Sequence, residues 1–220
     1  MIIDFALLFS LLPAFAKGLS VSLSIATLSC CIGVFVGVPF GVITAYKSLL
    51  RYPVALYVLV IRGTPMLIQI FFALYCLPTL GIHFAPFWLA VCAIGLNSAA
   101  YVSQIIRSGI QAVNRGMLEA AQALGFSWWQ TIWYFVLPHA IRITFPAIGN
   151  EFINLIKDSS LASTIGVMEL TRTGQLKMAG SYDLITIWAG VGACYLIVTS
   201  LLSFVLYIFE KRINAHVENK

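Results

Sequence analysis

The sequence predicts an all-α integral membrane protein with about five transmembrane helices. Of its 220 residues, 60% are hydrophobic and 10% are charged, and the mean hydropathy is +0.95. A soluble domain is about 45–50% apolar and about 25% charged, so this composition argues against both a soluble enzyme and a disordered chain. Residues 18–46, 63–106 and 184–209 carry no formal charge. Each stretch is longer than the roughly 20 residues that a helix needs to cross the hydrocarbon.

The N-terminal half of the chain predicts an interfacial segment and three spanning helices. Residues 1–18 are expected to lie at the membrane interface, because their apolar part is short and contains Pro13. The transmembrane domain, 19–212, begins with a helix over about 19–45. The second helix is expected from Pro53, which suits a first helical turn, to about 77. Prolines and a glycine break the chain over 77–86, and the third helix is expected over about 87–112.

The C-terminal half predicts a polar loop, two more spans and a tail. The loop covers 113–139, and the fourth helix follows it to about 157. A mixed loop precedes the fifth helix at about 185–209, and residues 213–220 form a cytoplasmic tail. The positive-inside rule predicts an N-terminus outside and a C-terminus inside. That topology places eight Lys and Arg residues in the cytoplasm, against three outside (Lys17, Arg172 and Lys177). The eight are Lys47, Arg51, Arg107, Arg115, Arg142, Lys211, Arg212 and Lys220.

Residues 113–139 suggest two short helices on the cytoplasmic side. The first is expected to end at Gly125 as a C-terminal cap. Ser127 and Gln130 have the spacing of a capping box for the second, which Pro138 is expected to interrupt. The alternative is a plain cytoplasmic hairpin with an interfacial tryptophan belt.

Several other kinds of chemistry find no support in the sequence. The basic residues occur singly between apolar segments, which argues against nucleic-acid binding and favours loops that flank a lipid bilayer. The five cysteines lie in apolar stretches without metal-ligand spacing, so we expect no metal site. No nucleophile motif is present, and we expect no catalytic residues.

Several motifs in the right order resemble those of a known family. The run Glu119-Ala120-Ala121, then Gly125 and Leu137-Pro138, resembles the EAA loop of permease subunits in bacterial ATP-binding-cassette importers. The segments RGTP at 62–65, NSAAY at 97–101, RSGI at 107–110 and KDSSL at 157–161 resemble segments of the polar amino-acid permeases. The resemblance covers about 15–212. Gln104, Met117 and His139 depart from the family's usual residues.

The resemblance implies a type I importer permease fold in the bacterial inner membrane. It implies that Glu119, Ala120, Ala121 and Gly125 form a coupling helix that docks on an ATP-binding-cassette ATPase subunit. The chain itself has no phosphate-binding loop, so we expect it to bind no cofactor and the partner ATPase to hold ATP and Mg²⁺. Further expected partners are a second permease subunit, identical or paralogous, and a periplasmic or extracytoplasmic amino-acid-binding protein.

Polar residues at membrane depth suggest a solute path. A charge at the centre of a membrane helix costs at least ~2.5–3.5 kcal/mol, so it needs a partner or water. Glu151 and Asp158 are seven residues apart and share a helix face. Thr64 precedes a proline that disrupts the second helix. The expected path residues are Arg62, Thr64, Asn97, Ser98, Tyr101, Glu151 and Asp158.

The acidic pair favours a cationic amino acid such as arginine, lysine or histidine. Its alternative is a purely structural role, in which Glu151 and Asp158 neutralise Arg62 and Lys157. The expected function is ATP-driven amino-acid import by alternating access. An ion-gradient-driven secondary carrier and a non-transporting membrane scaffold stay open as alternatives.

Overall fold

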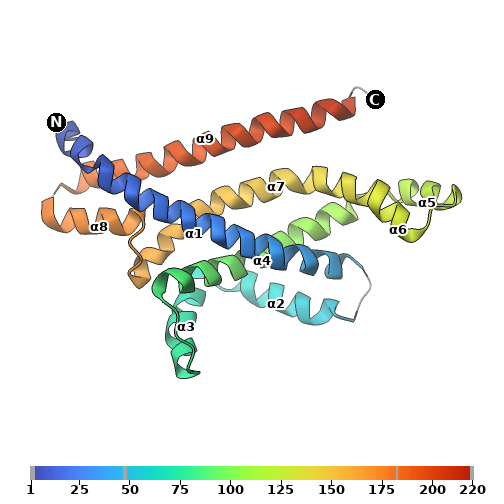
Figure 1. Cartoon of the computed structure of the whole chain (residues 1–220), viewed down its shortest axis with the longest axis horizontal. Coiled ribbons are helices and arrows are strands. Elements are labelled where there is room, and N and C mark those ends of the chain that lie inside the picture. Colours follow the sequence, from blue (N-terminus) through green and yellow to red (C-terminus); the bar gives the residue numbers. More distant parts are fainter. Residues whose placement is uncertain (1–2, 47–48, 182, 219–220) are drawn as a thin grey trace.

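A computed structural model describes residues 3–46, 49–181 and 183–218, so Lys47 and Lys220 of the orientation count, and the last residues of the expected tail, lie outside it. The regular elements of the described residues are all helical (Figure 1). In order they are α1 (Phe5–Ala45), α2 (Arg51–Gly63), α3 (Met66–Thr79), α4 (Pro86–Gln111), α5 (Arg115–Ala123), α6 (Trp128–Thr131), a π segment (Ile132–Val136), α7 (Leu137–Asp158), a 3₁₀ segment (Ser159–Ile165), α8 (Leu170–Ser181) and α9 (Leu184–Glu218).

Helix α1 is longer than the sequence suggested. The Asp4 carboxylate accepts hydrogen bonds from the backbone N–H groups of Ala6 and Leu7, so the helix begins at Phe5 and runs unbroken through Pro13. The expected boundary near residue 18 is therefore absent from the secondary structure. A helix of 41 residues is about 62 Å long. Because the hydrocarbon is about 30 Å thick, the first part of α1 can still lie at the interface, as expected.

The expected second span is broken in two. The chain bends by 106° between α2 and α3, at Thr64 and Pro65. The local disruption expected at this dipeptide is confirmed, and the helix expected from Pro53 to about 77 is divided there into α2 and α3. With 13 residues, α2 covers only about 20 Å, so the break lies within the depth of a bilayer that α1 crosses.

Among the described residues, three helices are long and apolar enough to cross a membrane, or up to four if the bent pair counts as one span. The three are α1, α4 and the part of α9 over Leu184–Arg212. The fourth expected span, α7, has the length but is too polar for this criterion, because Arg142, Glu151, Lys157 and Asp158 all lie on it. Five spans therefore stay a prediction.

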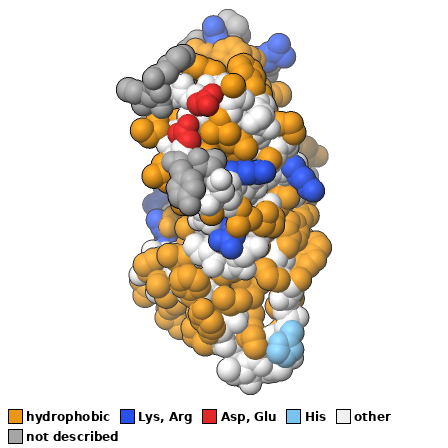
Figure 2. All heavy atoms as spheres, turned by 90° about the vertical axis from the view of Figure 1, so that its left-hand side faces the viewer, with side chains coloured by type: hydrophobic (Ala, Val, Ile, Leu, Met, Phe, Trp, Pro, Cys, Tyr) orange, Lys and Arg blue, Asp and Glu red, His pale blue; other side chains and the backbone are white. Residues whose placement is uncertain are grey.

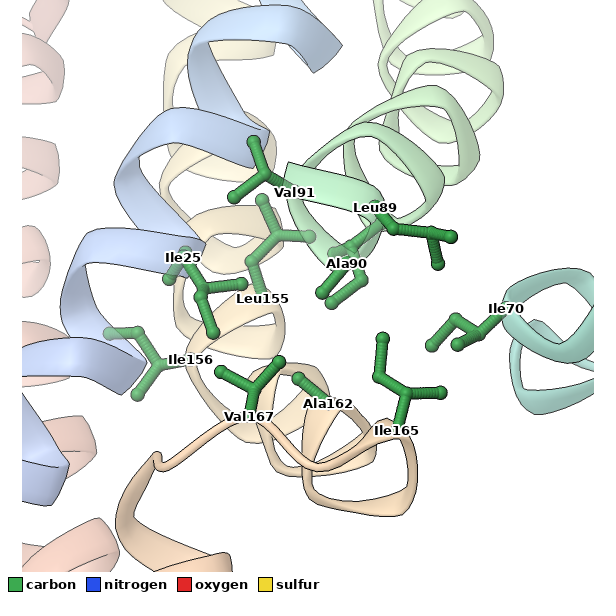
Figure 3. Close-up of a cluster of buried hydrophobic side chains, with 12 residues drawn as sticks. Ile25, Ile70, Leu89, Ala90, Val91, Leu155, Ile156, Ala162, Ile165 and Val167 are labelled. Atoms are coloured by element: carbon green, nitrogen blue, oxygen red, sulfur yellow. The ribbon is translucent and has the colours of Figure 1, made fainter. Parts of the chain in front are cut away.

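Among the described helices, α1 and α4 make the most extensive contact of the bundle. A Cβ on Gly33 would lie 2.7 Å from Ser98 Oγ, and one on Gly37 would lie 2.7 Å from the Ala99 carbonyl oxygen. These small residues, four apart, let the two backbones approach. Beside this seam a hydrophobic cluster joins α1, α3, α4, α7 and the 3₁₀ segment (Figure 3). Ile25 comes from α1, Val91 from α4 and Ile156 from α7, while Ile70 of α3 approaches Ile165.

The bundle has two distinct ends (Figure 1). Helices α5 and α6 and the C-terminal part of α9 lie at one end, which we call the loop end. The N-terminus, α8 and the start of α9 lie at the other, which we call the α8 end. The termini therefore lie at opposite ends, as an odd number of crossings requires. Figure 2 shows the α8 end with charged side chains in its upper part and largely hydrophobic side chains below, where α3 projects.

Candidate functional site

A cavity of about 790 Å³ lies between α4, α7 and the break that separates α2 from α3. The structure brings six of the seven expected path residues to its lining: Arg62, Thr64, Asn97, Tyr101, Glu151 and Asp158. Asn154 and Lys157 complete the α7 side. Ligand cavities measure about 300–1,000 Å³, so this volume is in the usual range for a small solute.

Ser98, the seventh expected residue, lies behind the cavity. Its side chain is fully buried, and Ser98 Oγ donates to the Glu151 carboxylate over 2.8 Å. Gly33 leaves the space that the serine occupies. Ser98 therefore orients the carboxylate of Glu151 from α4 and does not itself line the cavity.

The four charged side chains of the cavity are not joined as ion pairs. Arg62, Lys157, Glu151 and Asp158 are all described, and no nitrogen–oxygen distance of 4.0 Å or less joins any two of them. The Arg62 guanidinium instead lies over the Tyr101 ring, with its Cζ 5.1 Å from the ring centroid. The structure therefore shows no direct contact by which the two carboxylates neutralise Arg62 and Lys157. Both carboxylates stay available to a solute.

The helix break is stabilised by a residue that the sequence reasoning did not single out. Proline has no N–H, so the break at Pro65 leaves carbonyl groups at the end of α2 without helical partners. Gln69 Nε2 lies 2.7 Å from the Ile61 carbonyl oxygen, 3.1 Å from that of Thr64 and 2.8 Å from Thr64 Oγ1. Thr64 Oγ1 donates to the Val60 carbonyl oxygen over 2.9 Å. A lone polar residue four positions after a proline, in an apolar segment, was the available signal.

The same glutamine connects the break to α4. Asn97 Nδ2 donates to Gln69 Oε1 over 3.0 Å, and Asn97 is nearly fully buried. One amide side chain therefore fixes both the bend and the orientation of a cavity residue.

The loop at 113–139 has the two expected short helices. Helix α5 ends at a Schellman-type cap. The Phe126 N–H donates to the Ala121 carbonyl oxygen, and the Gly125 N–H donates to the Gln122 carbonyl oxygen. Gly125 has φ +81°, a conformation that glycine adopts without strain. The capping box of Ser127 and Gln130 at the start of α6 is confirmed, with both of its hydrogen bonds present.

The four expected coupling residues do not share one surface. Glu119 and Ala120 are exposed, whereas Ala121 is 1% exposed and packs inside the loop. Exposed apolar side chains surround the loop, among them Leu124, Trp128, Trp129 and Trp133. The exposed face of the loop therefore comprises Glu119, Ala120 and these apolar groups, while Ala121 packs inside and Gly125 forms the turn.

Pro138 does not interrupt the second loop helix, contrary to expectation. The π segment Ile132–Val136 leads directly into α7, where Pro138 occupies the first turn. Its missing N–H costs little at this position, because the wider π turn precedes it. The chain thus runs helically from Trp128 to Asp158, which connects the loop mechanically to the cavity residues on α7.

A second polar cluster, also missed from the sequence, surrounds Glu169 near the α8 end. The Glu169 side chain is fully buried. Its carboxylate accepts from Ser22 Oγ of α1 over 3.2 Å and from the Tyr195 hydroxyl of α9 over 2.9 Å. It also accepts from the backbone N–H groups of Thr171 and Arg172, 2.9 and 2.6 Å away. One carboxylate therefore ties α1, α8 and α9 together.

A polar cavity that opens on the side of a bundle of apolar helices, with an exposed two-helix loop continuous with α7, is typical of the permease subunit of a solute transporter. Residues 37–219 match the family of binding-protein-dependent transport system inner membrane components, and the chain belongs to this family.

Similar proteins narrow the class to amino-acid ATP-binding-cassette transporters. The chain superimposes on one from the crystal structure of an amino acid ABC transporter with histidines, with a TM-score of 0.91 and 35% identity over 96% of this chain and 100% of that one. The glutamine transport system permease protein GlnP of Escherichia coli (strain K12) is 38% identical, over 95% of this chain and 97% of its own length. The L-cystine transport system permease protein TcyB of Bacillus subtilis (strain 168) is 40% identical, over 76% of this chain and 72% of its own.

The chain is therefore a non-catalytic permease subunit of an amino-acid ABC importer, and ATP hydrolysis belongs to a separate subunit. This class excludes the two alternatives left open by the sequence, a secondary carrier and a membrane scaffold.

Proposed function

We propose that the chain carries a polar amino acid across the bacterial inner membrane and holds it in the 790 Å³ cavity during each cycle. The observation that carries this proposal is that Glu151 and Asp158 share the cavity with Arg62 without an ion pair between them. Two carboxylates and a guanidinium match the ammonium and carboxylate groups of an amino acid. The broken helix adds a second carboxylate site, since the N-terminus of α3 at Met66 borders the cavity.

The acidic pair favours a cationic amino acid. One carboxylate can hold the α-ammonium group, which leaves the other for a charged side chain. The names of the relatives above do not support a cationic substrate, because they name glutamine and cystine, which carry no net charge at neutral pH. A cationic substrate is therefore the finer part of the proposal.

We place the loop end in the cytoplasm and the N-terminus outside, as the positive-inside rule predicts. In that orientation the exposed face of Glu119 and Ala120 meets an ATPase subunit that holds ATP and Mg²⁺. The α8 end then faces an extracytoplasmic binding protein. Movement of the loop passes into α7 through the π segment, so closure of the ATPases alters the cavity.

A second permease subunit, identical or paralogous, completes the path. In the single chain the side chains of Arg62, Thr64 and Pro65 are exposed although they lie at membrane depth. Lipid is a poor neighbour for a guanidinium, whereas a second subunit can enclose it with water and solute.

The test is uptake by the full complex in proteoliposomes, with arginine and glutamine compared. For Glu151→Gln and Asp158→Asn we expect the KM for arginine to rise about tenfold or more, the cost of a lost charge-assisted hydrogen bond, and that for glutamine to rise less. Asn150→Ala is the control, because Asn150 is exposed beside Glu151 and bonds only the Pro146 carbonyl oxygen. Equal losses for both amino acids would point to a structural role and overturn the cationic preference. A KM unchanged for both would overturn the site.

A further inference from the structure

A second cavity of about 460 Å³ lies next to the first. It is bordered by Thr44 of α1, by α2 from Ala55 to Gly63, and by Tyr101, Gln104 and Arg107 of α4. The two cavities share three residues, Arg62, Gly63 and Tyr101. The contact between the Arg62 guanidinium and the Tyr101 ring therefore separates them, and we call this pair the partition.

The second cavity lies between the first cavity and the loop end. Helix α4 runs toward α5, and Arg107 is ten residues beyond Asn97, or about 15 Å along the helix. In the proposed orientation the smaller cavity is thus on the cytoplasmic side of the partition.

The charges of the two cavities differ in kind. The first holds two carboxylates and two cations, so both ends of an amino acid find partners there. The second holds Arg62 and Arg107 and no acidic residue. Neither guanidinium has a carboxylate within ion-pair distance in the part of the chain that the structure describes. An amino acid in this cavity can be held by its carboxylate alone, so it binds more weakly than in the first cavity.

We propose that the smaller cavity is an exit chamber, in which Arg107 and Arg62 receive the α-carboxylate of the amino acid after it passes the partition. The proposal rests on the proposed function, since the first cavity must hold the amino acid beforehand. It assigns the two cavities different tasks: Glu151 and Asp158 recognise the ammonium group and the side chain, whereas the chamber takes the carboxylate that all amino acids share.

The test replaces Arg107 in the full complex and measures ATP-driven uptake in proteoliposomes. For Arg107→Gln we expect kcat to fall about tenfold, as for one lost charge-assisted hydrogen bond, with KM changed less than about twofold. The fall should be equal for arginine and glutamine, and Arg107→Lys should retain about half of the wild-type rate. Arg51→Gln is the matched control, because Arg51 is a cation on α2 that lies over Tyr52 and borders neither cavity.

Several results would overturn the chamber. One is an Arg107→Gln variant as active as Arg51→Gln, and another is a change confined to KM. A loss seen only in vesicles with anionic lipids, and not in phosphatidylcholine, would show that Arg107 binds an anionic lipid headgroup instead. If Glu151→Gln raises KM while Arg107 behaves like Arg51, the chamber fails and the proposed function stands. If Glu151→Gln has no effect on KM, the proposed function itself fails.

The contact between Arg62 and Tyr101 is tested separately, by the amount of ATP consumed per amino acid transported. Tyr101→Leu removes the ring over which Arg62 lies, whereas Tyr101→Phe keeps it. We expect Tyr101→Leu to consume more ATP per amino acid delivered, because the amino acid can return from the chamber, and Tyr101→Phe to match the wild type. Equal ratios of ATP to amino acid in the two variants would overturn the role of the pair.

Discussion

Asn97 on α4 donates a hydrogen bond to Gln69 on α3, with 3.0 Å between Nδ2 and Oε1. The amide nitrogen of the same glutamine lies 2.7 Å from the Ile61 carbonyl oxygen, on the other side of the helix break. Gln69 is thus the link between the bend of the second span and the cavity residue Asn97.

Replacing Gln69 by leucine should impair transport without loss of the complex. The substitution keeps the volume but leaves the carbonyl groups of Ile61 and Thr64 without their donor, at about 1–3 kcal/mol for each unsatisfied group. We expect amino-acid uptake in proteoliposomes to fall at least about tenfold, while the ATPase still co-purifies.

Gln69→Glu tests the amide oxygen and the amide nitrogen separately. It keeps an oxygen that accepts from Asn97 and removes the NH2 group that donates to the carbonyl oxygens of Ile61 and Thr64. We expect it to be as impaired as Gln69→Leu. Gln111→Leu is the control, since Gln111 is exposed at the end of α4. Wild-type uptake by Gln69→Leu would show that the bend persists without the glutamine.

Gly125→Val should weaken docking of the ATPase. At φ +81° a β-branched residue costs roughly 1–2 kcal/mol, so the turn between α5 and α6 shifts and the exposed face of Glu119 with it. We expect less ATPase to co-purify and uptake to fall in proportion. Gly192→Val is the matched control, because a Cβ there meets open space in a helix. Normal co-purification with Gly125→Val would contradict a docking role for this turn.

Much of the fold could be predicted because its signals are local. Long apolar stretches predict α1, α4 and α9, and Ser127 with Gln130 predicts the start of α6 within four residues of sequence. The grouping of Arg62, Asn97, Glu151 and Asp158 in one cavity also follows from a simple rule, that charges at membrane depth avoid lipid.

The remaining features depend on contacts that no short segment contains. Thr64 and Pro65 predict a disruption, but they predict neither the 106° bend nor the hydrogen bond that joins Gln69 to the distant Asn97. Glu169 reads as one polar residue of a loop, and only the arrangement of α1 and α9 shows that Ser22 and Tyr195 bury it.

The start of α9 should weaken in acid. The Asp183 carboxylate accepts from the Thr186 N–H over 3.0 Å, and this hydrogen bond lowers the pKa of Asp183 below its ordinary value of 3.8. A lowered pKa in the folded state means stabilisation that is present above 3.8 and lost as the pH falls through the lower value. We expect the protection of the first residues of α9 against hydrogen exchange, corrected for the intrinsic pH dependence of amide exchange, to fall more steeply below pH 4 than in Asp183→Asn, which cannot titrate. Parallel pH profiles for the two proteins would contradict this.

The Glu169 cluster should stabilise the α8 end of the bundle. Glu169→Ala removes the acceptor of four donors, two of them hydroxyl groups from α1 and α9, in a site with no access to water. We expect the variant to lose about 2–4 kcal/mol of stability, measured as a lower Tm of the detergent-solubilised protein. Glu169→Gln keeps the volume and one acceptor oxygen, but its NH2 group cannot accept from the donors at the other position, so we expect an intermediate loss, which separates lost hydrogen bonds from lost volume. Glu210→Ala is the control, because it removes a glutamate near the end of α9 that makes no hydrogen bond or ion pair with the described residues. A Tm for Glu169→Ala equal to that of Glu210→Ala would show that the four donors find other acceptors and that the cluster does not hold α1, α8 and α9 together.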